Sequence, residues 1–378
     1  MSRAAVVVNN QQGAATGGVV QTGGKNAAAA VPQIPFTRAS MEHQEPFVDS
    51  SVAVGTNPVT VTGGPIDVPA YGFMTGIILS CTAAGGAGAN AVAKEDAPWS
   101  AIATVQLQDV NGAPIYITTG YNLYLANKYG GYGWASNPTG AGYTAMTTSG
   151  NFTFTLRIPV QISRRDALGA LPNSNSSSTY KLIINQAGET AVYSTAPTTR
   201  PTLRWRAWLE AWAQPPAQGI GGGTNAVQPP ALGTTQFWTE TVIGAAAGQV
   251  SLRLPRVGNL IRNLIFVARG SADGLRATGE TAFPADFQMQ WDSHFIFNQS
   301  KELNRFYVAE RFGYATPDNG VFVLDFTHDF TGHAGEELRD LWIPTVASSR
   351  LEIAGSFGAA ANVTVLTNDV APSGGVFL

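Results

Sequence analysis

The residues best suited to chemistry gather late in the chain, between positions 325 and 337. They are two histidines and four acids: Asp325, His328, Asp329, His333, Glu336 and Glu337. Histidine and carboxylate side chains are common ligands of metal ions. However, His328 and His333 are five residues apart, which places them on opposite faces of a strand and about 140° apart on a helix. We therefore predict a polar loop here, and a structural Ca²⁺-like cation site is the alternative.

No other set of residues has the spacing of a catalytic site. His43 and His294 are isolated, and no nucleophile elbow of the form Gly-x-Ser-x-Gly is present. Gly24 and Lys25 suggest a phosphate loop, but Val19 replaces its first glycine and no Ser or Thr follows the lysine. A carboxylate pair for glycoside hydrolysis stays open, although no acid lies in a recognisable motif. We predict no catalytic residue, no cofactor and no metal ligand.

The chain carries few charges. Charged residues make up 12% of the 378 positions, about half of the usual share of roughly 25%. Either other copies of the chain or many Ser, Thr, Asn and Gln side chains must then cover the surface, and we favour other copies. The net charge of −3 offers no basic surface to nucleic acid. Cys81 is the only cysteine, so no disulfide can form within the chain, which weakly favours folding in a reducing cytoplasm.

Neither a membrane span nor a secretion signal is expected. No apolar run approaches the ~18 residues that a spanning helix needs. The start of the chain, from Met1, lacks the apolar stretch of a signal peptide.

The segments that would position any functional residue occur twice along the chain. Residues 71–129 read YGFMTGIILSCTA, a Gly/Ala loop and WSAIATVQLQDVNGAPIYITTGYNLYLANKY. From position 257 the chain reads VGNLIRNLIFVAR, a Gly-rich loop and FPADFQMQWDSHFIFNQSKELNRFYVAERFG. Gly72 and Gly258 are separated by 258 − 72 = 186 residues, and Asn122 and Asn304 by 304 − 122 = 182. The offset shrinks only across loops, which predicts an internal structural duplication.

Both halves have the pattern of an antiparallel sandwich. Short alternating strands are separated by Gly, Pro and Asn turns, and strongly amphipathic helices are nearly absent. In the second half we predict strands at 238–243, 250–254, 260–268, 287–291, 295–297, 321–326, 351–353 and 363–366. About eight strands in each half predict an all-β chain of two concatenated eight-stranded antiparallel jelly rolls, with short helices in loops.

Composition places the domain boundaries. Residues 1–33 are a low-complexity arm of Gly, Ala, Gln, Asn and Val, which is either a flexible tail or an arm ordered by a neighbouring subunit. The first jelly roll is predicted at 34–214. Two Pro pairs and a Gly run mark a linker at 215–233, and the second jelly roll follows at 234–378.

Tryptophans lie on both faces of the predicted strand 203–212. Trp205 lies among apolar neighbours, whereas Trp208 and Trp212 share the other face with charged residues such as Arg206. A solvated face does not usually carry two tryptophans. We therefore predict that the other domain or another chain covers this face.

The order of these segments resembles that of the double jelly-roll major capsid proteins of tectivirus-like viruses, which are icosahedral and contain an internal membrane. The resemblance rests on YGFMTGIILSCTA, on the hairpin and helix NGAPIYITTGYNLYLANKY, and on FTLRIPVQISRRDALGALPNSNSSSTYKLIINQA. In that family a Gly-Phe strand, a hairpin with a short helix, and a turn before a Lys-Leu strand occur in the same order. The pattern covers residues 45–212, and in the second half the resemblance rests on strand order alone.

The resemblance implies a structural protein of a virion, such as a bacteriophage, and not an enzyme. Three chains would form a homotrimeric, pseudo-hexameric capsomer that contacts neighbouring capsomers in an icosahedral shell, assembled in the host cytoplasm. The arm 1–33 would face inward, towards an internal lipid membrane or minor capsid and vertex proteins, with no direct contact to nucleic acid. The loops 83–98, 130–150 and 270–284 would crown the outer surface.

Two other classes of function stay open. A carbohydrate- or receptor-binding β-sandwich, such as a lectin or a viral spike, would stack sugars on exposed rings at Tyr129, Tyr132 and Trp134. A glycan-cleaving β-sandwich enzyme would need a pair of acids that the sequence does not single out. The duplication favours the capsid protein over both.

Overall fold

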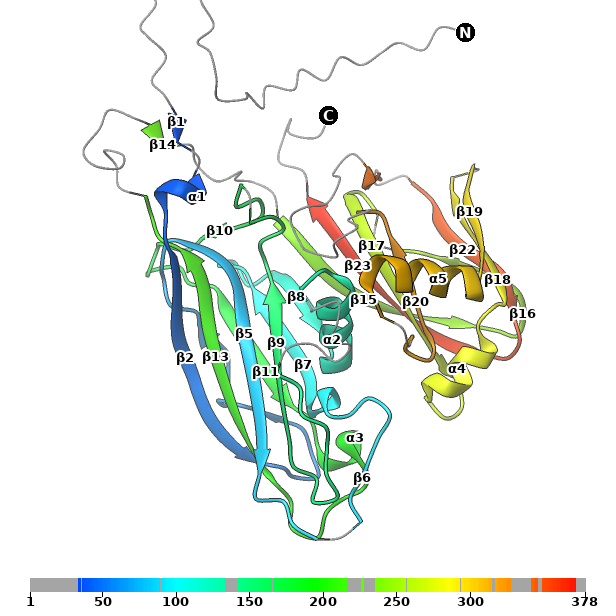
Figure 1. The fold of residues 1–378 in the computed structure, drawn as a ribbon, viewed down its shortest axis with the longest axis horizontal. Coiled ribbons are helices and arrows are strands. Elements are labelled where there is room, and N and C mark those ends of the chain that lie inside the picture. Colours follow the sequence, from blue (N-terminus) through cyan, green and yellow to red (C-terminus); the bar gives the residue numbers. More distant parts are fainter. Residues whose placement is uncertain are drawn as a thin grey trace, which may run out of the picture.

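The computed structural model describes residues 33–34, 36–88, 90–132, 142–164, 166–215, 226–227, 235–255, 257–292, 294–314, 317–327, 341–345 and 349–371. These residues fold mainly into β-strands with short helices in the connections (Figure 1). None of the helices in these ranges is long and apolar enough to cross a membrane.

The first half forms two antiparallel sheets. The first sheet has the order β2-β13-β5-β9, with bounds Glu42–Ala53, Thr202–Trp212, Phe73–Ala84 and Phe152–Pro159. The second sheet has the order β3-β11-β7-β8, with bounds Val59–Thr60, Lys181–Gln186, Ile102–Gln108 and Pro114–Thr118. The short strand β10 (Leu171–Pro172) also pairs with β5, and the short strand β4 (Ile66–Asp67) also pairs with β11. Helix α2 (Gly120–Tyr129) connects β8 to β9.

The second half repeats this arrangement. Its first sheet has the order β15-β23-β17-β20, with bounds Thr235–Ala245, Ala361–Ala371, Leu260–Gly270 and Val321–Asp325. Its second sheet has the order β16-β22-β18-β19, with bounds Gly248–Arg253, Leu351–Phe357, Asp286–Trp291 and His294–Ser300. Strand β21 (Ile343–Pro344) pairs with β17. Helix α5 (Lys301–Phe312) connects β19 to β20.

Counting the principal strands along each half shows the duplication. Strands 1 to 8 are β2, β3, β5, β7, β8, β9, β11 and β13 in the first half, and β15, β16, β17, β18, β19, β20, β22 and β23 in the second half. In both halves the first sheet then has the order 1-8-3-6 and the second has the order 2-7-4-5, and a helix follows the fifth strand. Two sheets joined in this way form a jelly roll. The predicted fold class is therefore confirmed, and each of the strands predicted for the second half is present.

Shorter elements join the sheets. They are α1 (Phe36–Ala39), β6 (Val92–Ala93), η1 (Trp99–Ala101), α3 (Glu189–Val192), β12 (Tyr193–Thr195) and α4 (Arg276–Ala282). Strand β1 (Gln33–Ile34) pairs in parallel with β14 (Ala226–Val227). Most of the predicted arm 1–33 and linker 215–233 lies outside the described residues, so the predicted boundaries stay predictions.

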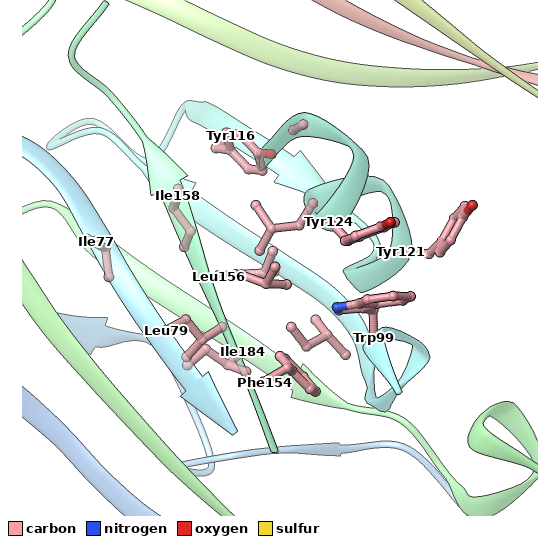
Figure 2. Close-up of a cluster of buried hydrophobic side chains, with 14 of the residues drawn as sticks. Ile77, Leu79, Trp99, Tyr116, Tyr121, Tyr124, Phe154, Leu156, Ile158 and Ile184 are labelled. Carbon is pink, nitrogen blue, oxygen red and sulfur yellow. The ribbon is translucent and has the colours of Figure 1, made fainter. Parts of the chain in front are cut away.

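Alternating side chains build the core of the first half. In β9, Phe154, Leu156 and Ile158 point inward because every second residue of a strand faces the same side. Figure 2 shows them meeting Ile77 and Leu79 of β5 and the aromatic rings of η1 and α2. The alternation that is typical of a strand therefore also accounts for which of its side chains are buried.

The two halves are joined by one sheet and one core. Strand β15 of the second half lies beside β8 of the first, in parallel, through the pair Trp238 and Tyr116. This contact links the sheets into the order β20-β17-β23-β15-β8-β7-β11-β3. The hydrophobic cluster of the first half also includes Trp238, Ile265 and Phe312 of the second half. The halves therefore pack as one body.

Two details differ from the sequence predictions. The segment 270–284, predicted as a polar loop, contains helix α4. The second tryptophan face of β13 is not covered by the second half: Arg206 is exposed and its guanidinium lies 4.7 Å from the half-buried Trp208 ring. Trp212 is instead covered within the first half, where its ring packs against Phe36 and belongs to a small cluster with Phe73.

Candidate functional site at the junction of the two halves

The cluster predicted to be a polar loop is placed only in part. Outside the described residues lie His328, Asp329, His333, Glu336 and Glu337. Asp325 is buried at the end of β20, where its carboxylate accepts a hydrogen bond from Thr327 Oγ1 (2.8 Å) and lies 3.6 Å from Arg311 Nη1. Within the described ranges, no group of three His, Cys, Asp or Glu side chains could hold a metal ion. Asp325 thus has protein partners of its own.

The remaining histidines lie on different halves and do not converge. The His43 ring, on β2, stacks on Tyr71 with 3.9 Å between ring centroids, and its Nε2 lies 3.5 Å from a carboxylate oxygen of Glu45. His294 is exposed at the start of β19. This agrees with the prediction that each is isolated.

The aromatic platform proposed for a sugar-binding protein is wrong at Tyr129. This side chain is 2% exposed and packs edge-on against Phe312 and Tyr314, which belong to the second half. Tyr132 is half-buried, and its hydroxyl donates to the carbonyl of Gln161 (3.2 Å). Trp134 lies outside the described residues. A buried ring cannot stack on a sugar, so the lectin alternative loses this support.

Helix α2 is the centre of the junction. Every one of its residues is buried, which is unusual for a helix of only three turns that carries a lysine. The Trp99 ring of η1 stacks on Tyr124 with 3.8 Å between centroids. A Cβ at Gly120 would lie 2.0 Å from the carbonyl oxygen of Trp99, so only glycine permits this approach. The helix is held against the first half on one side and covered by the second half on the other.

A carboxylate from the second half caps the start of α2. Glu240 Oε2, on β15, accepts hydrogen bonds from Thr118 Oγ1 (2.8 Å), Asn122 Nδ2 (2.7 Å) and the backbone N–H of Thr119 (3.3 Å). The first N–H groups of a helix have no partner within the helix and carry a partial positive charge. A negative charge at this position is therefore stabilised, and it ties β15 to α2.

An ion pair joins the end of α2 to the second half. Lys128 Nζ donates to Asp318 Oδ2 at 2.7 Å, and the same oxygen accepts from Tyr129 Oη at 2.8 Å. The ammonium also lies 4.8 Å from the centroid of the Tyr314 ring, a favourable cation–π geometry. Burial and the nearby Asp318 charge raise the pKa of the Tyr129 hydroxyl well above its usual range. The phenol stays protonated and keeps donating to Asp318.

Arginines of the second half form a third contact. Arg276 of α4 donates from Nε to Asp96 Oδ1 (2.7 Å), and Arg269 of β17 donates from Nη2 to Asp96 Oδ2 (2.6 Å). The backbone N–H of Arg276 donates to Glu95 Oε2 (2.7 Å), and its guanidinium lies 4.6 Å from the Tyr121 ring. The loop 83–98 and the segment 270–284, both predicted to face outward, thus bind each other.

The junction is suited to holding two domains at one angle. Two of its carboxylates form ion pairs: Asp96 pairs with Arg269 and Arg276, and Asp318 pairs with Lys128. Removing one member of such a buried pair costs more than the pair contributes, because a charge is left without a partner. We therefore interpret the junction as a mechanical site.

Sequence reasoning missed these residues. Lys128 lies in the segment predicted as a hairpin and short helix, and nothing in that pattern indicated that it is buried. Its partner Asp318 lies 190 positions away, so no local pattern connects them. The one available signal was a lysine between tyrosines in a segment without other charges.

The sequence matches no family model and no curated protein. Several solved structures share its fold. The STIV MCP, from Sulfolobus Turreted Icosahedral Virus, has a TM-score of 0.60 at 14% identity, over 88% of this chain and 98% of that chain. The major capsid protein P2 from bacteriophage PM2 has a TM-score of 0.53 at 13% identity, over 89% and 100% of the two chains. A chain of the PBCV-1 virus capsid has a TM-score of 0.54 at 12% identity, over 88% and 94%. At these identities the likeness shows the fold, the double jelly roll.

Proposed function

We propose that this double jelly-roll chain is a structural major capsid protein that forms homotrimers, and that these trimers tile an icosahedral shell. The observation that carries the proposal is the extent of the likeness. Two jelly rolls, in the same order, match almost the full length of three proteins whose names or titles place them in virus capsids. A structural role requires no catalytic group, and it places the protein in the shell of a virion.

The junction supports this role. A subunit that contributes two jelly rolls to one capsomer must keep them at one angle, and the shared core, the Glu240 cap and the two sets of ion pairs do so. The low share of charged residues suits a chain with broad contacts to copies of itself.

Further partners belong to the same proposal. Trimers would contact neighbouring capsomers, and residues 1–33 would face the interior, towards minor capsid or vertex proteins or an internal membrane. The net charge of −3 gives no support for direct binding to nucleic acid. The single cysteine, Cys81, is buried, which suits assembly in the reducing cytoplasm of a host cell.

The native mass in solution tests the proposal. The subunit mass is 39.6 kDa, so a trimer predicts 3 × 39.6 = 118.8 kDa by light scattering. A trimer that persists on dilution, and shells seen by electron microscopy when trimers are concentrated, are the expected results. A folded chain that stays monomeric at micromolar concentration would contradict the proposal.

A further inference from the structure

The sixth strand of each half, β9 or β20, lies at the edge of its first sheet. Among the strands of the described residues, β20 pairs with β17 and with no other long strand, and β9 pairs with β5, apart from an isolated bridge between Thr153 and Thr144. An edge strand carries a row of backbone N–H and C=O groups that another chain can pair with. In both halves the helix after the fifth strand, α2 or α5, lies beside this edge (Figure 1).

The hydrogen bonds of β20 show which of its backbone groups point away from the sheet. Just beyond its end, the N–H of Phe326 donates to the carbonyl of Arg262 (2.9 Å). Residues of an antiparallel strand alternate between those that bond to the neighbouring strand and those that point away from it. The even-numbered residues of β20 therefore bond to β17, and the odd-numbered residues, such as Val323 and Asp325, turn their backbone groups outward.

Asn304 of α5 takes up the outward groups of Val323. Its Nδ2 donates to the carbonyl of Val323 (2.9 Å), and its Oδ1 accepts from the N–H of Val323 (3.4 Å). A side-chain amide has one acceptor and a donor like those of the backbone, so it stands where a residue of a neighbouring strand would stand. Arg311 of the same helix donates from Nη1 to the carbonyl of Asp325 (2.7 Å). Side chains of α5 thus occupy two successive outward positions of this edge.

Asn127 of α2 makes the same contact in the first half. Its Nδ2 donates to the carbonyl of Arg157 in β9 (2.7 Å), and its Oδ1 accepts from the N–H of Arg157 (2.8 Å). The sequence overlay had placed Asn122 opposite Asn304, but Asn122 donates to Glu240 instead. The equivalent of Asn304 by contact is therefore Asn127.

The two helices have little else in common. Helix α2 is enclosed by the second half, whereas α5 buries only Asn304, Val308 and Phe312. Both asparagines are nevertheless buried, at 6% exposed for Asn127 and 1% for Asn304. An apolar side chain would fill the same space, but it would leave a buried N–H and a buried C=O without a partner. The amide at the sheet edge is thus the feature that both halves keep.

We infer that Asn127 and Asn304 cap the outer edges of the two first sheets and keep these edges closed to strand addition by another chain. Copies of the chain then associate through side chains and do not join their sheets. The inference goes beyond the proposed function, because it rests on hydrogen bonds within one chain. It matters most at Asn304, whose helix has an exposed outer side, and a chain that is packed beside many copies needs such protection most.

Hydrogen exchange tests the cap directly. Asn304→Ala removes the amide and leaves the N–H of Val323 without its acceptor. Deuterium uptake by peptides that cover β20, followed by mass spectrometry, should show one amide exchanging about tenfold faster or more than in the wild-type chain. Peptides of the neighbouring strand β17 should keep their exchange rates. Asn127→Ala should act in the same way on β9, and it provides a second variant if the first does not fold.

The control for exchange is Asn362→Ala, which removes an exposed asparagine from β23, a central strand of the same sheet. It should leave the exchange of β20 unchanged. Wild-type exchange of β20 in Asn304→Ala would overturn the inference. Equal acceleration of β17 and β20 would also overturn it, because it would show a general loss of stability and not an opened edge.

Light scattering tests the consequence for association. Asn304→Ala should form species larger than the wild-type particle, with the infrared amide band of intermolecular β-sheet. Val308→Ala is the matched control: it removes an apolar contact of the same helix, at 7% exposure, and keeps the amide. Urea is adjusted until both variants are equally stable. Equal aggregation of the two, or none by Asn304→Ala, would overturn the inference. These outcomes do not depend on whether the wild-type chain is a trimer, so the proposed function is tested separately.

Discussion

Lys128 and Asp318 show how a single residue pair can hold two domains together. The lysine side chain is 2% exposed and the aspartate 19%, so both charges have lost most of their water. Their attraction offsets that loss only while both are present. Tyr129 donates to the same carboxylate, which leaves Asp318 with a partner even when the lysine is absent.

We predict that Asp318→Ala is more damaging than Lys128→Met. Loss of the carboxylate leaves the buried ammonium unpaired and should lower the free energy of unfolding by about 3–5 kcal/mol. Lys128→Met keeps the volume and the Tyr129 hydrogen bond, so its loss should be smaller. Urea titration of both variants measures the difference. The matched control is Lys181→Met, whose partner Asp67 is exposed, and it should change stability little.

A second prediction concerns alkaline pH. Burial raises the pKa of Tyr121 and Tyr129 well above the usual value, and raises that of Tyr314 to about 12. In the unfolded chain tyrosine ionises near pH 10, so the stabilising effect is complete below about pH 10. Above that pH only the unfolded chain loses these protons, and each such tyrosine should then lower stability by about 1.4 kcal/mol per pH unit.

Unfolding experiments between neutral pH and pH 11 measure this slope. Tyr129→Phe removes one titrating group and should make the slope shallower by about one tyrosine. A tyrosinate absorbance of the folded protein that rises for all tyrosines with one midpoint at about pH 10 would show that the burial does not shift these groups.

Single residues of the junction could not be predicted from the sequence. His43 and His294 lie apart from one another, as predicted. The sugar-binding alternative needed Tyr129 on the surface, whereas the structure has it in the junction. Composition indicates how often a residue type is buried. It does not identify the residues of the other half that bury a particular side chain. Tyr129 is buried by Phe312, which is far away in the sequence.

Among the elements, α2 depends on a close approach at Gly120. Its packing on η1 leaves no room for a side chain, since a Cβ would lie 2.0 Å from the Trp99 carbonyl oxygen and 2.7 Å from the Ile102 Cβ. The helix must therefore move if the residue grows. Because the second half rests on α2, such a movement would also disturb the junction.

We expect Gly120→Ala to destabilise the protein by about 1–3 kcal/mol through overpacking. Gly64→Ala is the matched control, because nothing lies within 4 Å of a Cβ there and the backbone has no positive φ. That control should be neutral or stabilise the protein by up to about 1 kcal/mol. Thermal unfolding compares the two, and equal midpoints would contradict the close approach.

Strands were predicted better than helices, for a physical reason. The strands of both halves follow from alternation, which is a local property of the sequence. Helix α4 was missed because RATGETA has few apolar residues and an interior glycine, which lowers helix propensity. Gly279 is required by the tertiary structure, since a Cβ there would lie 2.0 Å from the carbonyl oxygen of Ala268 on β17.

At the scale of the whole molecule, the shared core predicts cooperative unfolding. One hydrophobic cluster contains residues of both halves, so neither half can lose its structure without exposing apolar surface of the other. We expect a single calorimetric transition with equal calorimetric and van't Hoff enthalpies. Trp238→Ala, at a fully buried position, should lower stability by about 3–5 kcal/mol and keep one transition. Two separated transitions in the wild-type chain would contradict this prediction.

The arrangement of the halves was only partly predictable. The duplicated pattern predicted two jelly rolls, but not that β15 would lie beside β8 or that α2 would be enclosed. The second half does not cover the Arg206 side of β13, so of the two predicted covers another chain remains. Repeats in a sequence specify the fold of each unit, whereas the contact between units depends on surfaces that differ between the copies.

The joined sheet has a consequence for shape. A closed shell is curved, so the plates that tile it must bend relative to one another. Among the described residues of one subunit, the β8–β15 contact and the common core hold the two jelly rolls together without a hinge between them. In a shell of such subunits, curvature would therefore be taken up where separate chains meet. Those contacts would set the radius of the particle, and each subunit would act as a stiff tile.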